Sequence, residues 1–406
     1  MLDINILRNN PEKVKTALLN RQMNPNLVDD FLNLDGKWRE LTNLIDDNRA
    51  ELNKASKSRN VEQGKKIKEK IKGLESEIKK ITENRKNLLY VFPNIPEQDA
   101  PIGKDESGNK VIRAWGEKSA EPKEDYLTFS ERLDLIDIKR AAKVAGARFS
   151  YLKNQVALIE FALINFAFEI LVKEGFTPIL PPVMIKPEFL KKTGYLSKED
   201  DDEKYYISKD DLYLVGTSEQ TVVPMHSDET LAEKDLPKRY VAFSTCFRRE
   251  SGSYGKDTRG ILRVHQFDKV EMVSFVNPED SAREFQFILS IQEKLMKKLK
   301  LPYRVVDVCT GDMGPAASKQ IDIETWMPSE KKYRETHSCS NTTDFQSRGL
   351  NIKYQAKGER KYLHILNGTV FSGRPIIAIL ENFQTKKGTV KIPSALIKYL
   401  PFKEIK

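Results

Sequence analysis

The fold of this chain is decided by residues 247–271, FRRESGSYGKDTRGILRVHQFDKVE. Apolar and charged positions mix at both ends of the stretch and a Gly/Ser-rich segment separates them, which predicts two antiparallel strands joined by a loop. Arginines on both strands would point inward, where a guanidinium can clamp phosphate oxygens bidentately. Phe267 offers an aromatic face for a purine. Charges buried in such a hairpin need partners, so a ligand with phosphate groups is the natural candidate, although taken alone the pattern also suits a solvated strand.

The rest of the chain contains no other recognisable phosphate-binding loop. It has no GxxxxGK[ST] sequence, and no GxGxxG that follows a strand into a helix. If the protein uses ATP, it therefore binds the phosphates through a motif other than the P-loop or the dinucleotide-binding turn.

Residues 1–92 read as helical. Pro11 opens a short helix, because proline suits the first turn of a helix. Two longer segments then carry apolar residues at alternating steps of three and four, and a polar segment at 56–60 joins them. We expect an antiparallel helical hairpin, or coiled-coil arm, with each helix extending roughly 35–40 Å at 1.5 Å per residue. The two apolar seams are Phe31, Leu34, Trp38, Leu41 and Ile45, and Ile67, Ile71, Leu74, Ile78 and Ile81.

The two helices of this hairpin differ in charge. Residues 27–52 carry seven acids against three bases, and residues 53–86 carry twelve bases against five acids. The helices can therefore attract each other, with positive charge left over on the second helix and the tip. Two interpretations remain open at this point: a solvated coiled-coil face, or an arm that binds RNA.

A domain boundary follows the hairpin. Pro93 and Pro96 end the helix, and residues 97–125 read as a linker. We place an N-terminal domain at 1–100 and a second domain at 101–406. In the second domain a strongly apolar helix is expected over 155–173, and short strands over 240–244 and 375–380. These are not spaced as regular βαβ units, so the predicted fold is α+β, with a mainly antiparallel sheet flanked by helices.

The composition indicates what kind of partner, metal content and cellular location to expect. The 406 residues are 39% hydrophobic and 31% charged, with a net charge of +9, which favours a polyanionic partner. Three distant cysteines give no disulfide framework and no zinc-site spacing with the four histidines, so zinc is not expected. The N-terminus lacks a signal pattern, and no apolar run was expected to reach the roughly 20 residues of a membrane span. A cytoplasmic location without a membrane partner is predicted.

Several ordered motifs resemble those of one family. Residues 247–271 resemble motif 2 of seryl-tRNA synthetases, Gly373-Arg374 with 378–382 resembles motif 3, and Gly175-Phe176-Thr177-Pro178 resembles motif 1, the dimer element of class II synthetases. Thr217-Ser218-Glu219 is similar to the TxE element that binds serine. Residues 322–328, 338–341 and the N-terminal start are similar as well, so the resemblance covers nearly the whole chain.

The resemblance implies a role for each matching residue. Arg248 would contact the α-phosphate of ATP, Glu250 would hold the adenine amino group, and Arg263 would support the outer phosphates. Phe267 would stack on adenine opposite Arg374, which would also reach the γ-phosphate. Catalysis is expected from Arg248, Arg374 and Glu335. The implied ATP-binding set is Arg248, Arg249, Glu250, Arg263, Val264, Phe267, Glu335, Thr336, His337, Ser338 and Arg374.

The resemblance also implies a serine pocket and a metal site. Thr217 and Glu219 would bind the serine amino group, and Glu271 would accept a hydrogen bond from the serine hydroxyl. Such a pocket can reject alanine by roughly 10⁴-fold, because alanine leaves its buried acceptor unpaired. Glu335 and Ser338 would hold Mg²⁺ through ATP, since Mg²⁺ prefers oxygen ligands. The implied serine-binding set is Thr217, Ser218, Glu219, Glu271, Thr369 and Asn367.

The sequence therefore predicts a homodimeric ligase that activates L-serine with ATP and charges tRNA(Ser), with tRNA(Sec) as a second candidate substrate. Two alternatives stay open. One is a ligase of the same fold that charges a carrier protein, which the arm-like seams argue against. The other is a catalytically silent paralogue that acts as an interaction protein, which the retained Arg248, Glu250 and Arg374 argue against.

Overall fold

The computed structural model describes residues 1–196, 203–251 and 260–406. By its internal contacts the chain forms two compact units, Met1–Ile95 and Pro96–Lys406. The Gly/Ser segment expected to join the two strands of the decisive hairpin, at 252–259, lies outside the described residues.

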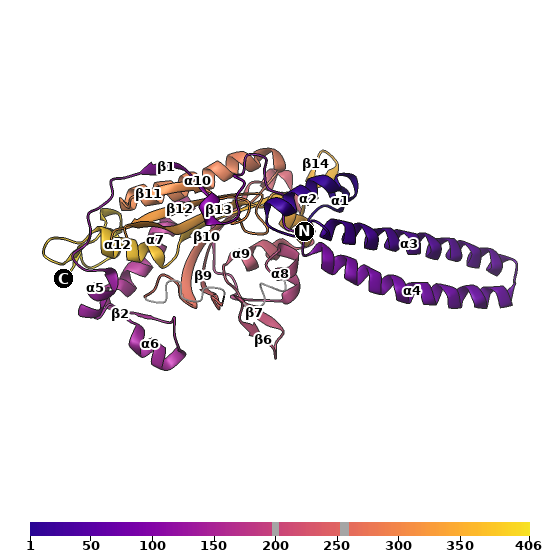
Figure 1. Ribbon diagram of the computed structural model, residues 1–406, viewed down its shortest axis with the longest axis horizontal. Coiled ribbons are helices and arrows are strands. Elements are labelled where there is room, and N and C mark those ends of the chain that lie inside the picture. Colours follow the sequence, from indigo (N-terminus) through magenta and orange to yellow (C-terminus); the bar gives the residue numbers. More distant parts are fainter. Residues whose placement is uncertain (197–202, 252–259) are drawn as a thin grey trace. The chain divides into compact units, whose positions relative to one another are not determined.

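The first unit is a helical hairpin with two short helices at its base. The long helices α3 and α4 run side by side in opposite directions (Figure 1), joined by a turn at 58–60, and Asn60 caps α4 by accepting a hydrogen bond from the backbone N–H of Gln63. Phe31, Ile45 and Ile71 lie buried in the seam, as their heptad spacing predicted. The expected coiled-coil arm is therefore confirmed. The helices are α1 (Ile4–Asn9), α2 (Pro11–Asn20), α3 (Leu27–Lys57) and α4 (Val61–Leu89).

The second unit is built on a twisted eight-stranded sheet. Its strands pair in the order β1-β11-β12-β13-β16-β10-β9-β4, and every neighbouring pair is antiparallel except β4 with β9. The α+β architecture with a mainly antiparallel sheet is thus confirmed. The strands are β1 (Lys110–Trp115), β4 (Thr177–Ile179), β9 (Lys238–Phe247), β10 (Gln266–Val276), β11 (Tyr303–Asp307), β12 (Lys319–Met327), β13 (Lys332–Asn341) and β16 (His364–Phe371).

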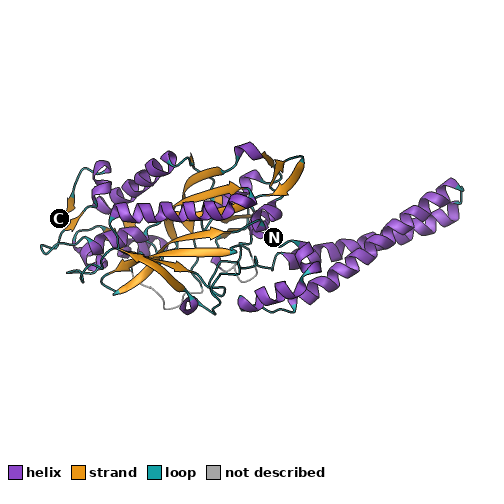
Figure 2. Ribbon diagram, turned by 90° about the horizontal axis from the view of Figure 1, so that it is seen from above, coloured by secondary structure: helices purple, strands orange, loops and turns teal. Residues whose placement is uncertain are grey.

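Helices α7 (Asn154–Lys173) and α10 (Ser281–Leu299) share the main hydrophobic core of this sheet. Figure 2 shows long helices lying across the strands. Helix α10 presents Phe285, Ile288 and Leu289 to the strands, at the three- and four-residue spacing that places them on one helical face. It lies so close to β16 that a Cβ at Gly368 would come within 2.5 Å of the Ile288 side chain. Glycine is therefore required where helix and strand touch.

One expected strand is a helix instead. Residues 375–380 were predicted as a strand from their apolar run, but α12 (Arg374–Asn382) is helical and Pro375 occupies its first turn. A short, fully buried apolar run does not distinguish strand from helix by periodicity, and the proline at the start was the signal that favoured a helix.

The prediction that no segment is apolar enough for a membrane span was wrong for α7. This one helix among the described residues meets that test by length and composition, with a mean hydropathy of 1.8 in its most apolar window, of which 39% is buried inside the protein. Its buried positions, among them Ile159, Leu163 and Phe166, pack in the core under the sheet.

The remaining described elements are short, and their strands pair in smaller sheets of two or three strands. They are α5 (Tyr126–Arg132), α6 (Ile138–Ala145), α8 (Pro187–Thr193), α9 (Glu219–Val222), α11 (Phe345–Leu350), β2 (Ile136–Asp137), β3 (Tyr151–Leu152), β5 (Met184–Ile185), β6 (Tyr206–Ile207), β7 (Leu212–Leu214), β8 (Thr230–Ala232), β14 (Lys353–Ala356), β15 (Glu359–Tyr362), β17 (Val390–Lys391), β18 (Glu404–Ile405), and the 3-10 turns η1 (Glu106–Gly108), η3 (Val223–His226), η4 (Glu233–Asp235), η5 (Pro278–Asp280) and η6 (Ser394–Tyr399).

Candidate active site

The decisive stretch forms the expected antiparallel pair at the centre of the site. Strands β9 and β10 pair in continuous register from Gln266 opposite Phe247 to Phe275 opposite Lys238. Beyond the end of β9 the two segments of the hairpin stay paired, because the Arg248 N–H donates to the His265 carbonyl at 2.9 Å. The side chains that follow Phe247 and those that precede Gln266 therefore meet at one end of the hairpin.

A cavity of about 130 Å³ opens at that end, between the hairpin, β13, β16 and the start of α12. It brings together most of the predicted ATP-binding residues from segments more than 100 residues apart. Its lining consists of Arg248, Glu250, Ile261, Leu262, Arg263, Val264, Phe267, Lys269, Glu335, Thr336, Ser338, Thr369, Ser372, Gly373 and Arg374.

Charged side chains in this cavity are paired with one another. Arg263 donates to the Glu250 carboxylate at 2.6 Å, and Arg374 donates to the Glu335 carbonyl at 2.6 Å while lying 3.3 Å from its carboxylate. Burial opposes ionisation of Glu335, but Arg374 and then Arg248 lower its pKa below the ordinary value. Glu335 is therefore a charged carboxylate in a cationic setting, which suits a group that faces phosphates and a cation.

Arg248 lies beside the ring that was expected to stack on adenine. Its guanidinium carbon is 5.2 Å from the centre of the Phe267 ring, and its Nε and Nη2 donate to the Gly216 carbonyl at 3.3 and 3.2 Å. Gly216 directly precedes the Thr217-Ser218-Glu219 segment. One arginine thus connects this cavity with the predicted serine pocket.

The predicted serine pocket is continuous with this cavity through Lys269. Thr217, Ser218 and Glu219 lie buried at the start of α9, and Glu271 is buried on β10. Lys269 donates to the Thr217 hydroxyl at 3.2 Å and lies 2.5 Å from a carboxylate oxygen of Glu271.

Thr369 stands opposite Glu271 in the β10–β16 register and hydrogen-bonds its carboxylate. The Glu271 oxygen that the Lys269 ammonium approaches is Oε2, so the charge of this buried carboxylate is balanced by the lysine. An ionised carboxylate accepts several hydrogen bonds, so Glu271 can still accept one from a substrate hydroxyl beside its contacts with Lys269 and Thr369.

Besides the buried residues of the predicted serine pocket just described, Arg249, His337 and Asn367 also lie outside the cavity lining. Arg249 is exposed, with its guanidinium 6.0 Å from the centre of the Tyr205 ring. His337 is fully buried, and a hydrogen bond of 2.8 Å joins its Nδ1 to the Thr336 hydroxyl. Asn367 lies on β16, two residues before Thr369 and on the same face of the strand.

Within the described ranges, no group of three or more His, Cys, Asp or Glu side chains is arranged to hold a metal ion. Glu335 and Ser338, however, both line the cavity from β13. A carboxylate and a hydroxyl next to a phosphate site fit Mg²⁺, which typically takes one or two protein ligands together with phosphate oxygens.

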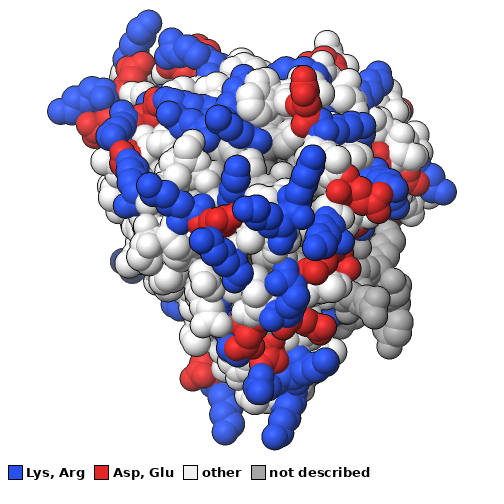
Figure 3. Space-filling view, turned by 90° about the vertical axis from the view of Figure 1, so that its left-hand side faces the viewer, with Lys and Arg blue, Asp and Glu red and all other residues white. Residues whose placement is uncertain are grey.

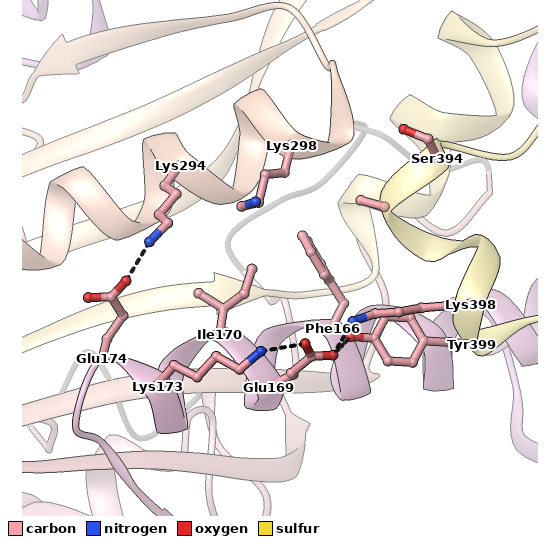
Figure 4. Close-up of a pocket in the computed structure, with 11 residues that line it drawn as sticks. Phe166, Glu169, Ile170, Lys173, Glu174, Lys294, Lys298, Ser394, Lys398 and Tyr399 are labelled. Atoms are coloured by element: carbon pink, nitrogen blue, oxygen red, sulfur yellow. Dashed lines mark hydrogen bonds and ion pairs between the residues drawn. The ribbon is translucent and has the colours of Figure 1, made fainter.

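A larger hollow, of about 370 Å³, lies elsewhere, between α7, α10 and η6 (Figure 4). The Glu169 carboxylate accepts hydrogen bonds from Lys173 at 2.8 Å and from Lys398 and Tyr399, and Lys294 bonds Glu174 at 2.5 Å. These bonds lower the pKa of Glu169 to about 2. Both carboxylates therefore join structural elements to one another.

Four residues important for the geometry of the site were missed from the sequence. Lys269 lies between two motif residues and was read only as part of the motif 2 string. Tyr195 and Gln346 hydrogen-bond Glu219 from distant segments. Gln292 of α10 donates to the Ser338 and Thr369 carbonyls at 2.9 and 2.8 Å, and so ties β13 to β16 beneath the cavity. Only its polar position on an otherwise apolar helix face could have signalled Gln292.

An antiparallel sheet that carries arginines at the end of a central hairpin, and a further arginine at the start of the helix after β16, defines the catalytic core of a class II aminoacyl-tRNA synthetase. The family model for the tRNA synthetase class II core domain (G, H, P, S and T) matches residues 202–383. The seryl-tRNA synthetase N-terminal domain model matches residues 1–96. The chain belongs to the seryl-tRNA synthetase family, and the prediction of a ligase of class II is confirmed.

Individual relatives agree over the full length of the chain. The serine–tRNA ligase of Thermotoga neapolitana is 42% identical over 100% of both chains, and that of Pseudothermotoga lettingae is 42% identical over 98% and 99%. The seryl-tRNA synthetase of Pyrococcus horikoshii, solved in complex with ATP, has 40% identity, covers 100% and 99% of the two chains, and superposes with a TM-score of 0.94. The serine–tRNA ligase of Naegleria fowleri, solved with AMP, has 32% identity and a TM-score of 0.90 over the same coverage.

Proposed function

We propose that this chain joins L-serine to tRNA(Ser) in two steps within the site described above. The serine carboxylate attacks the α-phosphorus of ATP, which forms seryl-adenylate and releases pyrophosphate. A terminal ribose hydroxyl of the tRNA then attacks the adenylate carbonyl, and AMP leaves. No side chain is needed as a nucleophile, so orientation and charge stabilisation carry the catalysis.

The observation that carries this proposal is the connection of two pockets by Arg248 and Lys269. Arg248 lines the ATP cavity and donates to Gly216, beside the serine pocket. A guanidinium at the boundary is suited to the α-phosphate, where negative charge develops as the serine carboxylate attacks. Glu250 and Phe267 would hold adenine, and Arg263 and Arg374 would hold the outer phosphates.

Mg²⁺ is proposed to bind Glu335 and Ser338 together with ATP. When bound, the ion would neutralise phosphate charge and favour departure of pyrophosphate. The ionised state of Glu335, which Arg374 and Arg248 favour, supports this assignment. Thr336 and Val264 complete the walls of the cavity, whereas Arg249, Ser218 and Asn367 would act from its margins.

Serine-dependent exchange of labelled pyrophosphate into ATP tests the first step. We expect exchange with serine and Mg²⁺, and a rate lower by several orders of magnitude with alanine in place of serine. Charging of tRNA(Ser) tests the second step, and tRNA(Sec) should be compared in the same assay. Pure, folded protein that exchanges no pyrophosphate would overturn the proposal and would favour the silent paralogue.

The basic composition and the arm support tRNA as the acceptor, rather than a carrier protein. Residues 53–86 carry twelve bases against five acids on α4 and the tip of the hairpin. On one face of the molecule, Lys and Arg side chains also predominate over Asp and Glu (Figure 3). We propose residues 1–100 as the tRNA-binding domain and 101–406 as the catalytic domain, in a cytoplasmic enzyme.

A homodimer is proposed from an apolar stripe on α7 and the strand that follows. Leu158, Phe161 and Val172 recur at helical spacing and are 44%, 62% and 49% exposed, and Leu180 beyond β4 is 79% exposed. Several large apolar side chains exposed along one helix are typical of a contact between subunits. Sedimentation at micromolar concentration should give a dimer. Phe161→Glu should give monomers, and an unchanged dimer in that variant would place the contact elsewhere.

A further inference from the structure

The serine pocket contains two buried carboxylates whose neighbours differ in charge. Glu219 Oε2 accepts a hydrogen bond from the Tyr195 hydroxyl at 2.6 Å, and its Oε1 accepts one from the Gln346 amide at 2.8 Å. Both donors are neutral, and the Lys269 ammonium acts on this carboxylate through its charge at longer range. Glu271 instead lies 2.5 Å from the ammonium of Lys269. The two glutamates are 3% and 1% exposed, so both interact with their neighbours in a medium that screens charge poorly.

This difference decides what each carboxylate can still bind. Neutral donors favour the ionised form of Glu219 without cancelling its charge, so it remains an attractive site for a cation. The charge of Glu271 is already balanced by Lys269, and a second cation there would be repelled by the Lys269 ammonium. A hydroxyl suffers no such repulsion, and a carboxylate offers about four acceptor positions, so Glu271 can accept a hydrogen bond from a hydroxyl in addition to its contact with Lys269.

Lys269 is well placed to impose this asymmetry. Its side chain is only 11% exposed, and its Nζ contacts Thr217 from one pocket wall and Glu271 from the other. It therefore stands between the proposed amino-group site and the proposed hydroxyl site.

We propose that Lys269, opposed by the neutral pair Tyr195 and Gln346, sets amino-acid specificity by charge, so that only the Glu219 end of the pocket accepts an ammonium group. This inference rests on the proposed function and deepens it. Lys269 is a specificity-determining residue, and Tyr195 and Gln346 are positioning residues for Glu219. The arrangement rejects an amino acid of serine's size that carries a second ammonium in place of the hydroxyl, namely L-2,3-diaminopropionate.

The Lys269 arm of the proposal is tested with Lys269→Met. L-2,3-diaminopropionate is assayed as a competitor of serine in pyrophosphate exchange, at a pH low enough for both of its amines to be protonated. Relative to the KM for serine, its inhibition constant should fall by at least about 10-fold in the variant, since a factor of 10 corresponds to about 1.4 kcal/mol of removed repulsion. Lys269→Arg should keep the wild-type ratio. A better-bound competitor is a gain that misfolding does not produce.

Two further measurements guard this test. If the Lys269→Met variant exchanges pyrophosphate too slowly to assay, binding is measured instead. The rise in melting temperature is recorded with ATP and diaminopropionate and again with ATP and serine, and the two rises compare the affinities for the two amino acids. Lys319→Met is the matched control, because Lys319 is also a buried lysine, paired with Asp307 at 3.0 Å outside the site. It should leave the ratio unchanged. An unchanged ratio in Lys269→Met by both measurements would overturn the assignment of Lys269.

The Glu219 arm is tested with Tyr195→Phe and with Gln346→Leu. Serine and alanine share the ammonium group, so kcat/KM should fall for both amino acids by the same factor, roughly 10-fold per lost bond to a charged acceptor. The ratio between the two amino acids should not change. Burial already raises the pKa of Glu219, and loss of a donor should raise it further. The acid limb of kcat/KM for serine should therefore move to higher pH.

Tyr240→Phe provides the control for this arm. It removes one hydroxyl from a buried tyrosine that hydrogen-bonds His226 at 2.9 Å instead of Glu219, and should leave the acid limb in place. An unmoved acid limb in Tyr195→Phe and Gln346→Leu, or a change in the serine-to-alanine ratio, would overturn the role given to this pair.

If wild-type protein shows no serine-dependent exchange, the proposed function itself fails. If wild-type protein exchanges normally and the variants do not differ from their controls, only the present inference fails.

Discussion

The residues of the ATP cavity form two ion pairs, Arg263 with Glu250 and Arg374 with Glu335, at opposite walls. Each pair joins segments that are separate in sequence, so the pairs hold the cavity walls in place as well as supplying charge. Of the four residues, Arg374 has the clearest electrostatic role, since it is the first cause of the lowered pKa of Glu335. Its removal should therefore disturb both phosphate binding and the carboxylate proposed to face Mg²⁺.

Arg374→Ala should lower kcat/KM for pyrophosphate exchange by about 10²–10³-fold, the usual effect of deleting one preorganised group that stabilises transition-state charge. The melting temperature should change little, because the side chain is partly exposed at the cavity wall. The measurement is exchange kinetics with serine saturating and ATP varied. Arg283→Ala is the matched control, as Arg283 is 78% exposed and pairs only with Asp280 among the described residues. Equal rates in the two variants would contradict the role of Arg374.

At this scale, motif residues were predictable from the sequence and their supporting residues were not. Arg248, Glu250 and Glu271 stand in one continuous string, and their type and spacing carry the signal. Tyr195 and Gln346 reach Glu219 from positions 24 residues before it and 127 residues after it, and neither stands in a recognisable pattern. A hydrogen bond across such a separation depends on the packing of α8 and α11, which local sequence does not encode.

Among the elements, the helices of the N-terminal unit are joined by one buried carboxylate. Asp35 of α3 is fully buried, accepts two hydrogen bonds of 2.8 Å from Arg8 of α1, and accepts one of 2.7 Å from Arg85 of α4. Burial alone would raise the pKa of Asp35, but the two arginines lower it overall. The seam periodicity predicted the helices, whereas this network, which fixes α1 against the hairpin, was not visible in it.

Asp35→Ala should destabilise the N-terminal unit by about 1–3 kcal/mol, because it leaves the guanidinium groups of Arg8 and Arg85, whose side chains are 30% and 14% exposed, without their carboxylate. Hydrogen exchange of the α3 and α4 amides in the full chain measures this locally. Since the folded-state pKa of Asp35 is lowered, its contribution is present above the unfolded-state pKa, near 4, and is lost as the pH falls below it. The wild type should therefore lose protection in acid more steeply than the variant.

The control for this prediction is Asp46→Ala on the same helix. Asp46 is 65% exposed and lies 3.6 Å from Arg49, so its removal should cost less than about 1 kcal/mol. Equal protection of the amides in both variants would mean that the buried Asp35 network stabilises the unit no more than the exposed Asp46–Arg49 pair does.

In the catalytic unit, some helices and strands were predictable from the sequence, but the order of the strands in the sheet was not. The β9–β10 hairpin and α7 were predictable, since adjacent strands and a long apolar helix have strong local signals. The order of the whole sheet was not, because β1 pairs with β11, and β16 pairs with β13 and β10, across intervening helices and strands. Helix α12 was mistaken for a strand because its apolar residues are buried on all sides, so no polar face revealed the helical period.

At the scale of the whole molecule, chemistry and proposed tRNA binding belong to different compact units. The cavity residues all lie in Pro96–Lys406, and the basic helix α4 lies in Met1–Ile95. Each unit has its own hydrophobic core, which for the first includes Leu7, Phe31 and Phe92. Two cores allow the arm to be shortened without disturbing the sheet that carries the cavity.

Removal of residues 30–88 should therefore leave serine-dependent pyrophosphate exchange within about 3-fold of the wild-type rate, while tRNA charging falls by at least about 10²-fold. The loss should appear in KM for tRNA, because the deleted lysines and arginines are proposed to contact phosphates, and each phosphate contact adds to the salt dependence of binding. In the full chain, tRNA affinity should fall steeply as salt rises, and the truncated chain should show a shallower slope. A milder variant replaces Lys65, Lys68 and Lys72 of α4 by Gln, and it should reduce the salt dependence of tRNA affinity without altering pyrophosphate exchange. The control for net charge makes the same replacements in the catalytic unit, at Lys173, Lys297 and Lys298. Equal loss of exchange and charging on truncation would contradict the separation of the two functions between the two units.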